Sequence, residues 1–104
     1  MNEKLINNNK IFFSNKPLIS IILPSFNKED IIMKSIRSIQ NQSLKNIEII
    51  IVDDCSTDNS SNIFTYLLKT DPRIRLFTHL KNMGVWRSRI DGFLYFKRRI
   101  CYTF

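Results

Sequence analysis

Two short aliphatic runs constrain the fold of this chain more than any other feature. Residues 18–23 read Leu-Ile-Ser-Ile-Ile-Leu and residues 47–52 read Ile-Glu-Ile-Ile-Ile-Val, so both runs are apolar on both faces. This pattern is typical of strands in a parallel sheet that is covered by helices on each side. We expect Pro24 to end the first strand, because proline has no amide hydrogen to donate to a neighbouring strand.

The segment between the two runs has helical spacing. Asn27 is placed to cap a helix over residues 28–42, and Glu29 and Asp30 would lie in its first turn, where carboxylates favour the positive end of the helix dipole. Apolar residues then recur at intervals of three and four, which predicts one buried helix face.

The alternation of strand and helix continues to the end of the chain. A second helix is predicted to end near Thr70, followed by a strand over 74–77 and a third helix over 85–96. The predicted fold is therefore α/β: a partial Rossmann-like parallel sheet of three strand–helix units, joined by right-handed crossovers. Ligands of such sheets bind at the carboxyl ends of the strands, so the turn after Leu23 and the pair Asp53–Asp54 are expected to face one crevice.

The acidic pair Asp53–Asp54 has two interpretations on spacing alone. One carboxylate can point into the crevice and accept hydrogen bonds from sugar hydroxyls or a base N–H, or both can cap the turn into the second helix. A dinucleotide-binding domain is excluded, because the turn after the first strand contains no glycine to let the backbone approach a pyrophosphate.

The charge of the chain is concentrated in its last third. The formal net charge is +7, and residues 1–71 contain equal numbers of basic and acidic residues, whereas residues 72–104 contain eight Lys and Arg and one acid, Asp91. Such a segment attracts anionic partners. An interaction module that binds nucleic acid or an anionic membrane is therefore an alternative function, although no recognised nucleic-acid motif supports a nucleic-acid partner.

Cysteine content and hydropathy bear on the compartment. Two cysteines are too few for a disulfide framework, and the N-terminal residues lack the apolar stretch of a signal peptide. No apolar run approaches the roughly 18 residues that span a bilayer, so no transmembrane segment is expected. We expect a cytoplasmic protein, or one at the cytosolic face of a membrane.

Four segments together resemble, in order and spacing, the N-terminal part of the family 2 inverting glycosyltransferases. They are residues 20–27 (Ser-Ile-Ile-Leu-Pro-Ser-Phe-Asn), 38–43 (Ser-Ile-Gln-Asn-Gln-Ser), 48–58 (Glu-Ile-Ile-Ile-Val-Asp-Asp-Cys-Ser-Thr-Asp) and 82–89 (Asn-Met-Gly-Val-Trp-Arg-Ser-Arg). The resemblance spans about residues 17–96. It implies the nucleotide-sugar-binding half of an A-type glycosyltransferase fold, with a UDP-sugar as the expected donor and an acceptor that the sequence does not identify.

The resemblance also implies a set of nucleotide-binding residues. They are Pro24, Phe26, Asn27, Asp53, Asp54 and Arg89. By this analogy Asp54 bonds the uracil or ribose and Asp53 supports the same loop. Phe26 would lie against the base, with ordinary loop packing as the alternative. Arg89 would offset phosphate charge, with a solvated helix surface as the alternative.

The sequence also departs from the family pattern. Members usually have Asn where this chain has Ile90, and they continue into a strand ending in an Asp-x-Asp or Asp-Asp motif that holds Mn²⁺ or Mg²⁺. Here residues 97–104 contain no acid. We therefore assign no metal ligand and no catalytic residue, and expect a truncated transferase fragment that binds nucleotide weakly or is inactive. An open edge at its last strand is expected to promote aggregation.

The expected domain division follows the resemblance. Residues 1–16 form a leader of uncertain order, residues 17–96 the nucleotide-binding region, and residues 97–104 a basic tail outside the family pattern. Within the middle region, Asp58 is expected to cap a helix, Cys55 is not expected to act as a nucleophile, and His79 is expected to be a plain loop residue. Four aromatic residues are expected to pack in a core: Trp86, Phe93, Tyr95 and Phe96.

Overall fold

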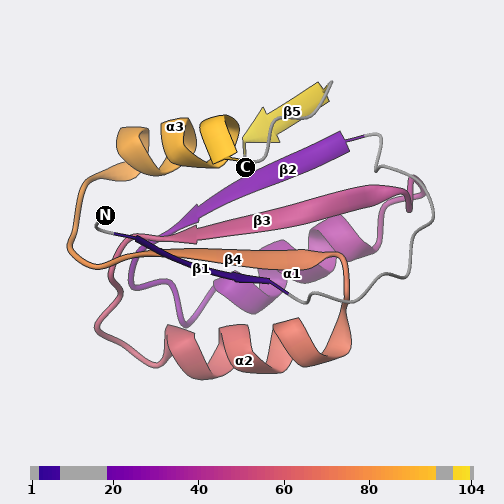
Figure 1. Cartoon of the computed structure of the whole chain (residues 1–104). Coiled ribbons are helices and arrows are strands. Elements are labelled where there is room, and N and C mark those ends of the chain that lie inside the picture. Colours follow the sequence, from indigo (N-terminus) through magenta and orange to yellow (C-terminus); the bar gives the residue numbers. More distant parts are fainter. Residues whose placement is uncertain (1–2, 8–18, 96–99, 104) are drawn as a thin grey trace.

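A five-stranded sheet with helices on both faces forms the centre of the molecule (Figure 1). The computed structural model describes residues 3–7, 19–95 and 100–103. The strands are β1 (Glu3–Asn7), β2 (Ile19–Ser25), β3 (Ile47–Asp53), β4 (Ile74–His79) and β5 (Ile100–Thr103). The helices are α1 (Ile32–Gln40), α2 (Ser60–Thr70) and α3 (Val85–Tyr95). None of the helices in the described ranges is long and apolar enough to cross a bilayer.

The strand order β1-β4-β3-β2-β5 contains the three predicted parallel strands at its centre. β2 pairs with β3 from Ile19↔Ile47 to Ser25↔Asp53, and β3 pairs with β4, all in parallel. The prediction of three parallel strand–helix units is therefore confirmed. β5 adds a parallel strand beside β2, and β1 adds an antiparallel strand beside β4.

The strand β1 changes the expectation for the sheet edge. It comes from the segment described above as a leader, and it pairs with β4 over its whole length, from Glu3↔His79 to Asn7↔Arg75. The edge of β4 that was expected to be open is therefore covered, so that expectation was wrong. A pairing partner some seventy residues away gives no periodic signal along a single sequence.

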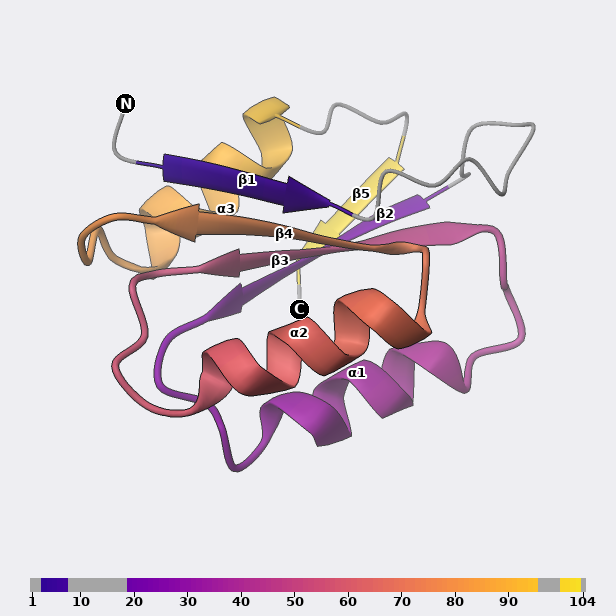
Figure 2. The same cartoon turned by 60° about the horizontal axis from the view of Figure 1, so that its bottom comes forward.

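Each face of the sheet has its own core. Helices α1 and α2 cover one face and α3 covers the other (Figure 2). The larger core lies under α1 and α2, where alternate strand residues meet the buried faces of both helices. Its members include Ile21, Leu23, Ile49, Ile51, Ile32, Ile36, Ile39, Phe64 and Leu67. Each of these buried side chains contributes roughly 1.5–3 kcal/mol through removal of apolar surface from water.

Helix α3 approaches the second face closely because of Gly92. The smaller core on this face consists of Ile22, Ile50, Val52 and Phe77. A Cβ atom at Gly92 would lie 2.7 Å from Cγ2 of Ile22 and 3.3 Å from Cγ2 of Val52. The absence of a side chain at Gly92 therefore sets the distance between α3 and the sheet.

Pro24 does not end the first strand as predicted, since β2 continues through Ser25. The carbonyl of Ser25 accepts a hydrogen bond from the amide of Asp54 on the β3 side. Backbone groups of successive residues point to alternate sides of a strand, so the backbone nitrogen of Pro24 points to the β5 side. The described pairing with β5 covers only Ile19 to Ile22, so no neighbouring strand needs the missing amide.

The start of the first helix was also predicted wrongly. Its cap is Ile31, and no acidic residue lies in its first turn, so Glu29 and Asp30 precede the helix. Asn27 has a left-handed backbone with φ 51° and is used elsewhere, as described below. Leu18 and Phe96, where a strand and a helix were predicted to begin and end, lie outside the described residues, as do residues 97–99 and the side chains of Phe93 and Tyr95.

Candidate functional site

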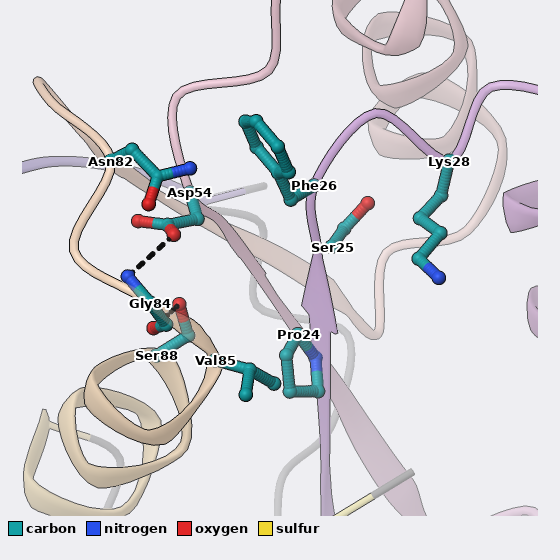
Figure 3. Close-up of a pocket in the computed structure, with 9 residues that line it drawn as sticks. All are labelled: Pro24, Ser25, Phe26, Lys28, Asp54, Asn82, Gly84, Val85 and Ser88. Carbon is teal, nitrogen blue, oxygen red and sulfur yellow. Dashed lines mark hydrogen bonds between the residues drawn. The ribbon is translucent and has the colours of Figure 1, made fainter.

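The carboxyl ends of β2, β3 and β4 meet at one edge of the sheet and enclose a cavity. Ser25 pairs with Asp53, and the amide of Asp54 donates to the carbonyl of Ser25 at 2.8 Å. The expectation that the turn after Leu23 and the acidic pair lie side by side is therefore confirmed. The cavity has a volume of about 350 Å³, and we call it the edge cavity (Figure 3). Its lining residues are Pro24, Ser25, Phe26, Lys28, Asp54, Asn82, Gly84, Val85 and Ser88.

Asp54 is the buried carboxylate of the edge cavity. Its Oδ1 accepts hydrogen bonds from Nδ1 of His79 at 2.8 Å and from the amide of Met83 at 2.7 Å, and its Oδ2 accepts one from the amide of Gly84 at 2.8 Å. Burial alone would raise the pKa of Asp54, but these hydrogen bonds outweigh it and leave the pKa below its ordinary value. A carboxylate offers about four acceptor positions, so one position on Oδ2 remains for a ligand.

Asp53 has a different environment although it is the next residue along the chain. Its carboxylate accepts hydrogen bonds from the amide and the hydroxyl of Ser56, which bends the loop after β3. Burial raises the pKa of Asp53, and the hydrogen bonds from Ser56 oppose that shift only in part. Asp53 does not line the edge cavity. Its position fits the loop-supporting role that the family resemblance implies.

Asn27 ties the loop after β2 to the loop after β3. Its side-chain oxygen accepts hydrogen bonds from the backbone amides of Thr57 at 2.8 Å and Asp58 at 3.3 Å. Its backbone amide donates to the hydroxyl of Ser56 at 3.0 Å. Asp58 in turn accepts a hydrogen bond from the amide of Ser60, the first residue of α2, although the N-cap position of α2 is Asn59. Asn27 therefore holds the mouth of the edge cavity without lining it.

Phe26 presents an aromatic face at the mouth of the edge cavity. Its side chain is 41% exposed, which is unusual for a phenylalanine. Figure 3 shows Phe26 and Asp54 on the same side of the end of β2, with Lys28 on the other side. An exposed ring beside a buried acceptor suits a flat ligand that carries an N–H group.

Arg89 lies on α3, and the structure does not bring it into the lining of the edge cavity. Its guanidinium lies 5.3 Å from the ring centroid of Trp86, in a cation–π contact. Trp86 is 72% exposed, so the prediction that it packs in a core is wrong. Lys28 is the cationic residue among the described lining residues, and sequence reasoning did not single it out.

His79 is the functional residue that sequence reasoning placed wrongly. It is the last residue of β4, and its side chain is fully buried rather than part of an exposed loop. Its Nδ1 lies 2.8 Å from Oδ1 of Asp54, and its Nε2 lies 2.7 Å from Oδ2 of Asp91 on α3. Strand alternation beyond Phe77 was the available signal, because residues 77 and 79 share the face that α3 covers.

The described residues do not provide a metal site. No group of three or more His, Cys, Asp or Glu side chains in residues 3–7, 19–95 and 100–103 is arranged to hold a metal ion. The Asp53–Asp54 pair does not substitute for one, because it supplies only two carboxylates and Asp53 does not line the edge cavity. The divalent cation that the family resemblance implies therefore has no fitting ligand set in this part of the chain.

Comparison with curated proteins gives close relatives over part of the chain. It is 46% identical over 78 residues to an uncharacterized glycosyltransferase of Haemophilus influenzae, covering 75% of this chain and 31% of that protein. It is 44% identical over 61 residues to the GalNAc(5)-diNAcBac-PP-undecaprenol beta-1,3-glucosyltransferase of Campylobacter jejuni, covering 59% and 20%. The chain therefore spans about a third or less of the length of these two relatives.

Comparison with solved structures gives the same fold. The mannosyltransferase PcManGT of Pyrobaculum calidifontis, solved with GDP-Man and Mn²⁺, superposes with a TM-score of 0.69 at 18% identity, covering 86% of this chain and 26% of that one. A model of glycosyl transferase family 2 matches residues 20–104, which include the segment expected to lie outside the family pattern. With four fifths of its residues under that model and its three central strand–helix units in the matching fold, the chain belongs to glycosyltransferase family 2.

Proposed function

We propose that this chain forms the nucleotide-sugar-binding part of an inverting glycosyltransferase, which moves a sugar from a nucleotide-sugar donor to an acceptor hydroxyl. The observation that carries this proposal is the edge cavity, where Asp54 keeps one acceptor position beside the exposed ring of Phe26. Ligands of parallel α/β sheets bind at this edge. Family membership supports sugar transfer as the reaction class.

The hydrogen bonds of Asp54 favour uracil as the base of the donor. Oδ1 already accepts from His79 and Met83, and Oδ2 accepts from Gly84, so one acceptor position is left. Uracil presents a single ring N–H between two carbonyl groups, which matches one acceptor. Guanine presents two adjacent N–H groups, which require two acceptor positions side by side. A UDP-sugar is therefore the donor that we propose.

The other proposed residues have distinct tasks. Pro24 and Phe26 form apolar surface around the base and ribose, whereas Asn27 and Asp53 hold the two loops that carry them. Lys28 supplies a positive charge to the cavity for the diphosphate. We also propose Arg89 as a phosphate contact. This role requires its guanidinium to move away from Trp86 when the ligand binds.

The described residues account for donor binding and not for the transfer step itself. Inverting transfer requires a general base that deprotonates the acceptor hydroxyl. Asp53 and Asp54 accept hydrogen bonds at the end of the proposed site that holds the nucleobase. We therefore assign neither of them the role of general base.

Isothermal titration of the chain with UDP and GDP tests this proposal. We expect UDP to bind more tightly than GDP, with or without Mn²⁺. Asp54→Asn should weaken UDP binding by about tenfold or more, since a hydrogen bond to a charged group contributes about 1.5–3 kcal/mol. Asp30→Asn is the matched control, because Asp30 is exposed and does not line the cavity. Equal UDP affinity in all three proteins would contradict the proposal, and tighter binding of GDP would contradict the choice of base.

A further inference from the structure

We propose that His79 is a positioning residue, which holds the Asp54 carboxylate in place for nucleotide binding by connecting it to Asp91 on α3. This inference rests on the proposed function. His79 lies between the two carboxylates, with Nδ1 2.8 Å from Asp54 and Nε2 2.7 Å from Asp91. All three residues are buried, with exposed fractions of 1% for His79, 3% for Asp54 and 1% for Asp91.

Each ring nitrogen of His79 faces a carboxylate. Asp54 also accepts from the amides of Met83 and Gly84, and Asp91 also accepts from Nε of Arg87 at 2.8 Å. An ionised carboxylate only accepts hydrogen bonds, so a ring nitrogen of His79 that faces one is placed to donate. The half-exposed guanidinium of Arg87 places a positive charge beside the buried carboxylate of Asp91.

This cluster determines how the wall of the edge cavity is placed. The loop of Met83 and Gly84 donates to Asp54, and α3 begins at the next residue, Val85. Asp91 lies on that same helix and contacts His79, which in turn contacts Asp54. Asp54, the loop of Met83 and Gly84, helix α3 and His79 therefore form a closed ring of contacts. Val85 and Ser88 of α3 line the cavity, and their distance from Asp54 depends on this ring.

A specific role for the Nδ1 bond can be separated from a general contribution to stability. An asparagine side chain places its amide nitrogen where His79 has Nδ1, so His79→Asn keeps a donor to Asp54 and loses the donor to Asp91. A glutamine side chain places its amide nitrogen near the position of Nε2, so His79→Gln keeps the donor to Asp91 and loses the one to Asp54. Both substitutions remove the imidazole ring, so each is the matched control for the other.

The test uses two measurements on the chain. Isothermal titration gives the affinity for UDP, and hydrogen exchange of the Met83 and Gly84 amides is followed without nucleotide. We expect His79→Asn to bind UDP within about threefold of the unmodified chain and His79→Gln to bind at least about tenfold more weakly. Exchange at Met83 and Gly84 should be faster in His79→Gln than in His79→Asn. Equal loss of affinity and of amide protection in both variants, or no loss in either, would overturn the inference.

Failure of the proposed function and failure of the positioning role give different results. If the unmodified chain binds no UDP, the proposed function fails, whereas the exchange rates of Met83 and Gly84 still test the positioning role. If a variant does not fold, ¹⁵N NMR of the unmodified chain at pH 7 replaces it. A proton on Nδ1 of His79 would support the inference, and a bare Nδ1 would overturn it.

Discussion

Asp53 and Asp54 show how neighbouring residues of one kind acquire different roles. Side chains alternate between the faces of a strand, so the two carboxylates leave the end of β3 in opposite directions. Asp53 meets Ser56 and has a raised pKa because of burial, whereas Asp54 meets His79 and two backbone amides, and its pKa is lowered despite burial. Of the two, only Asp54 lines the edge cavity.

Phe26→Ala tests the aromatic wall of the same cavity. Aromatic contacts contribute about 0.5–1.5 kcal/mol beyond the area they bury, so we expect UDP affinity to fall by about twofold to tenfold. Tyr66→Ala removes an aromatic side chain of similar exposure on α2, which does not line the cavity, and it should leave affinity unchanged. Isothermal titration of both variants makes the comparison. Unchanged affinity in Phe26→Ala would show that the ring only packs against its own loop.

At the scale of elements, Asp71 and Arg73 join three parts of the chain at the far end of the sheet. Asp71 accepts hydrogen bonds from Gln40 at the end of α1 and from Arg73 before β4, and Arg73 also donates to the carbonyl of Lys45. Burial raises the pKa of Asp71, but the hydrogen bonds from Arg73 and Gln40 outweigh it, so the pKa is lowered overall.

Asp71→Asn should therefore change the acid stability of the protein. We expect the free energy of unfolding at pH 7 to fall by about 1–3 kcal/mol, because an N–H group would face the donors of Arg73. The pKa is lower in the folded state than the unfolded value of about 3.9, so the contribution of Asp71 is complete above that pH and is lost as the pH falls through the folded value. Urea unfolding at pH 7, 5 and 3 should show the difference shrinking only at the lowest pH. A difference that is constant with pH would contradict this account, and Asp30→Asn provides the control.

Gly92 tests how α3 is fitted to the sheet. Gly92→Ala would place a methyl group 2.7 Å from Cγ2 of Ile22, so we expect a loss of about 1–3 kcal/mol in the free energy of unfolding despite the better helix propensity of alanine. Ile22→Ala removes the opposing atoms. Urea unfolding of the double variant should show a smaller loss than the sum of the two single variants. Simple additivity would show that α3 moves away from the sheet at little cost.

The sequence predicts the elements whose signals are local and misses those that depend on distant contacts. Strands β2 and β3 follow from contiguous apolar runs, β4 follows from the alternation of residues 74–77, and the juxtaposition of Ser25 with Asp53 follows from parallel pairing. Asn27 has the side chain of a helix cap, but it satisfies amides of Thr57 and Asp58, thirty residues away. His79 was assigned to a loop because β4 was predicted to end two residues too early, at Phe77.

At the scale of the whole molecule, internal pairing accounts for part of the positive charge of residues 72–104. Arg73 pairs with Asp71, Arg75 with Glu48 and Arg87 with Asp91, each at 2.8 or 2.9 Å. The paired carboxylates offset the charge of these three side chains, which therefore contribute less to an external field than the sequence suggests. The alternative function as a basic interaction module therefore gains no support from them, whereas the edge cavity supports nucleotide binding.

The central claim of this account is that ligand binds where β2, β3 and β4 end, and NMR tests it most directly. Titration of the ¹⁵N-labelled chain with UDP should shift the amide signals of Phe26, Asp54, Met83, Gly84 and Ser88 most strongly, since all of them lie at or beside the edge cavity. Signals at the opposite edge, such as those of Lys45 and Arg73, should remain in place. Shifts centred on that opposite edge, or no shifts at millimolar UDP, would contradict the account.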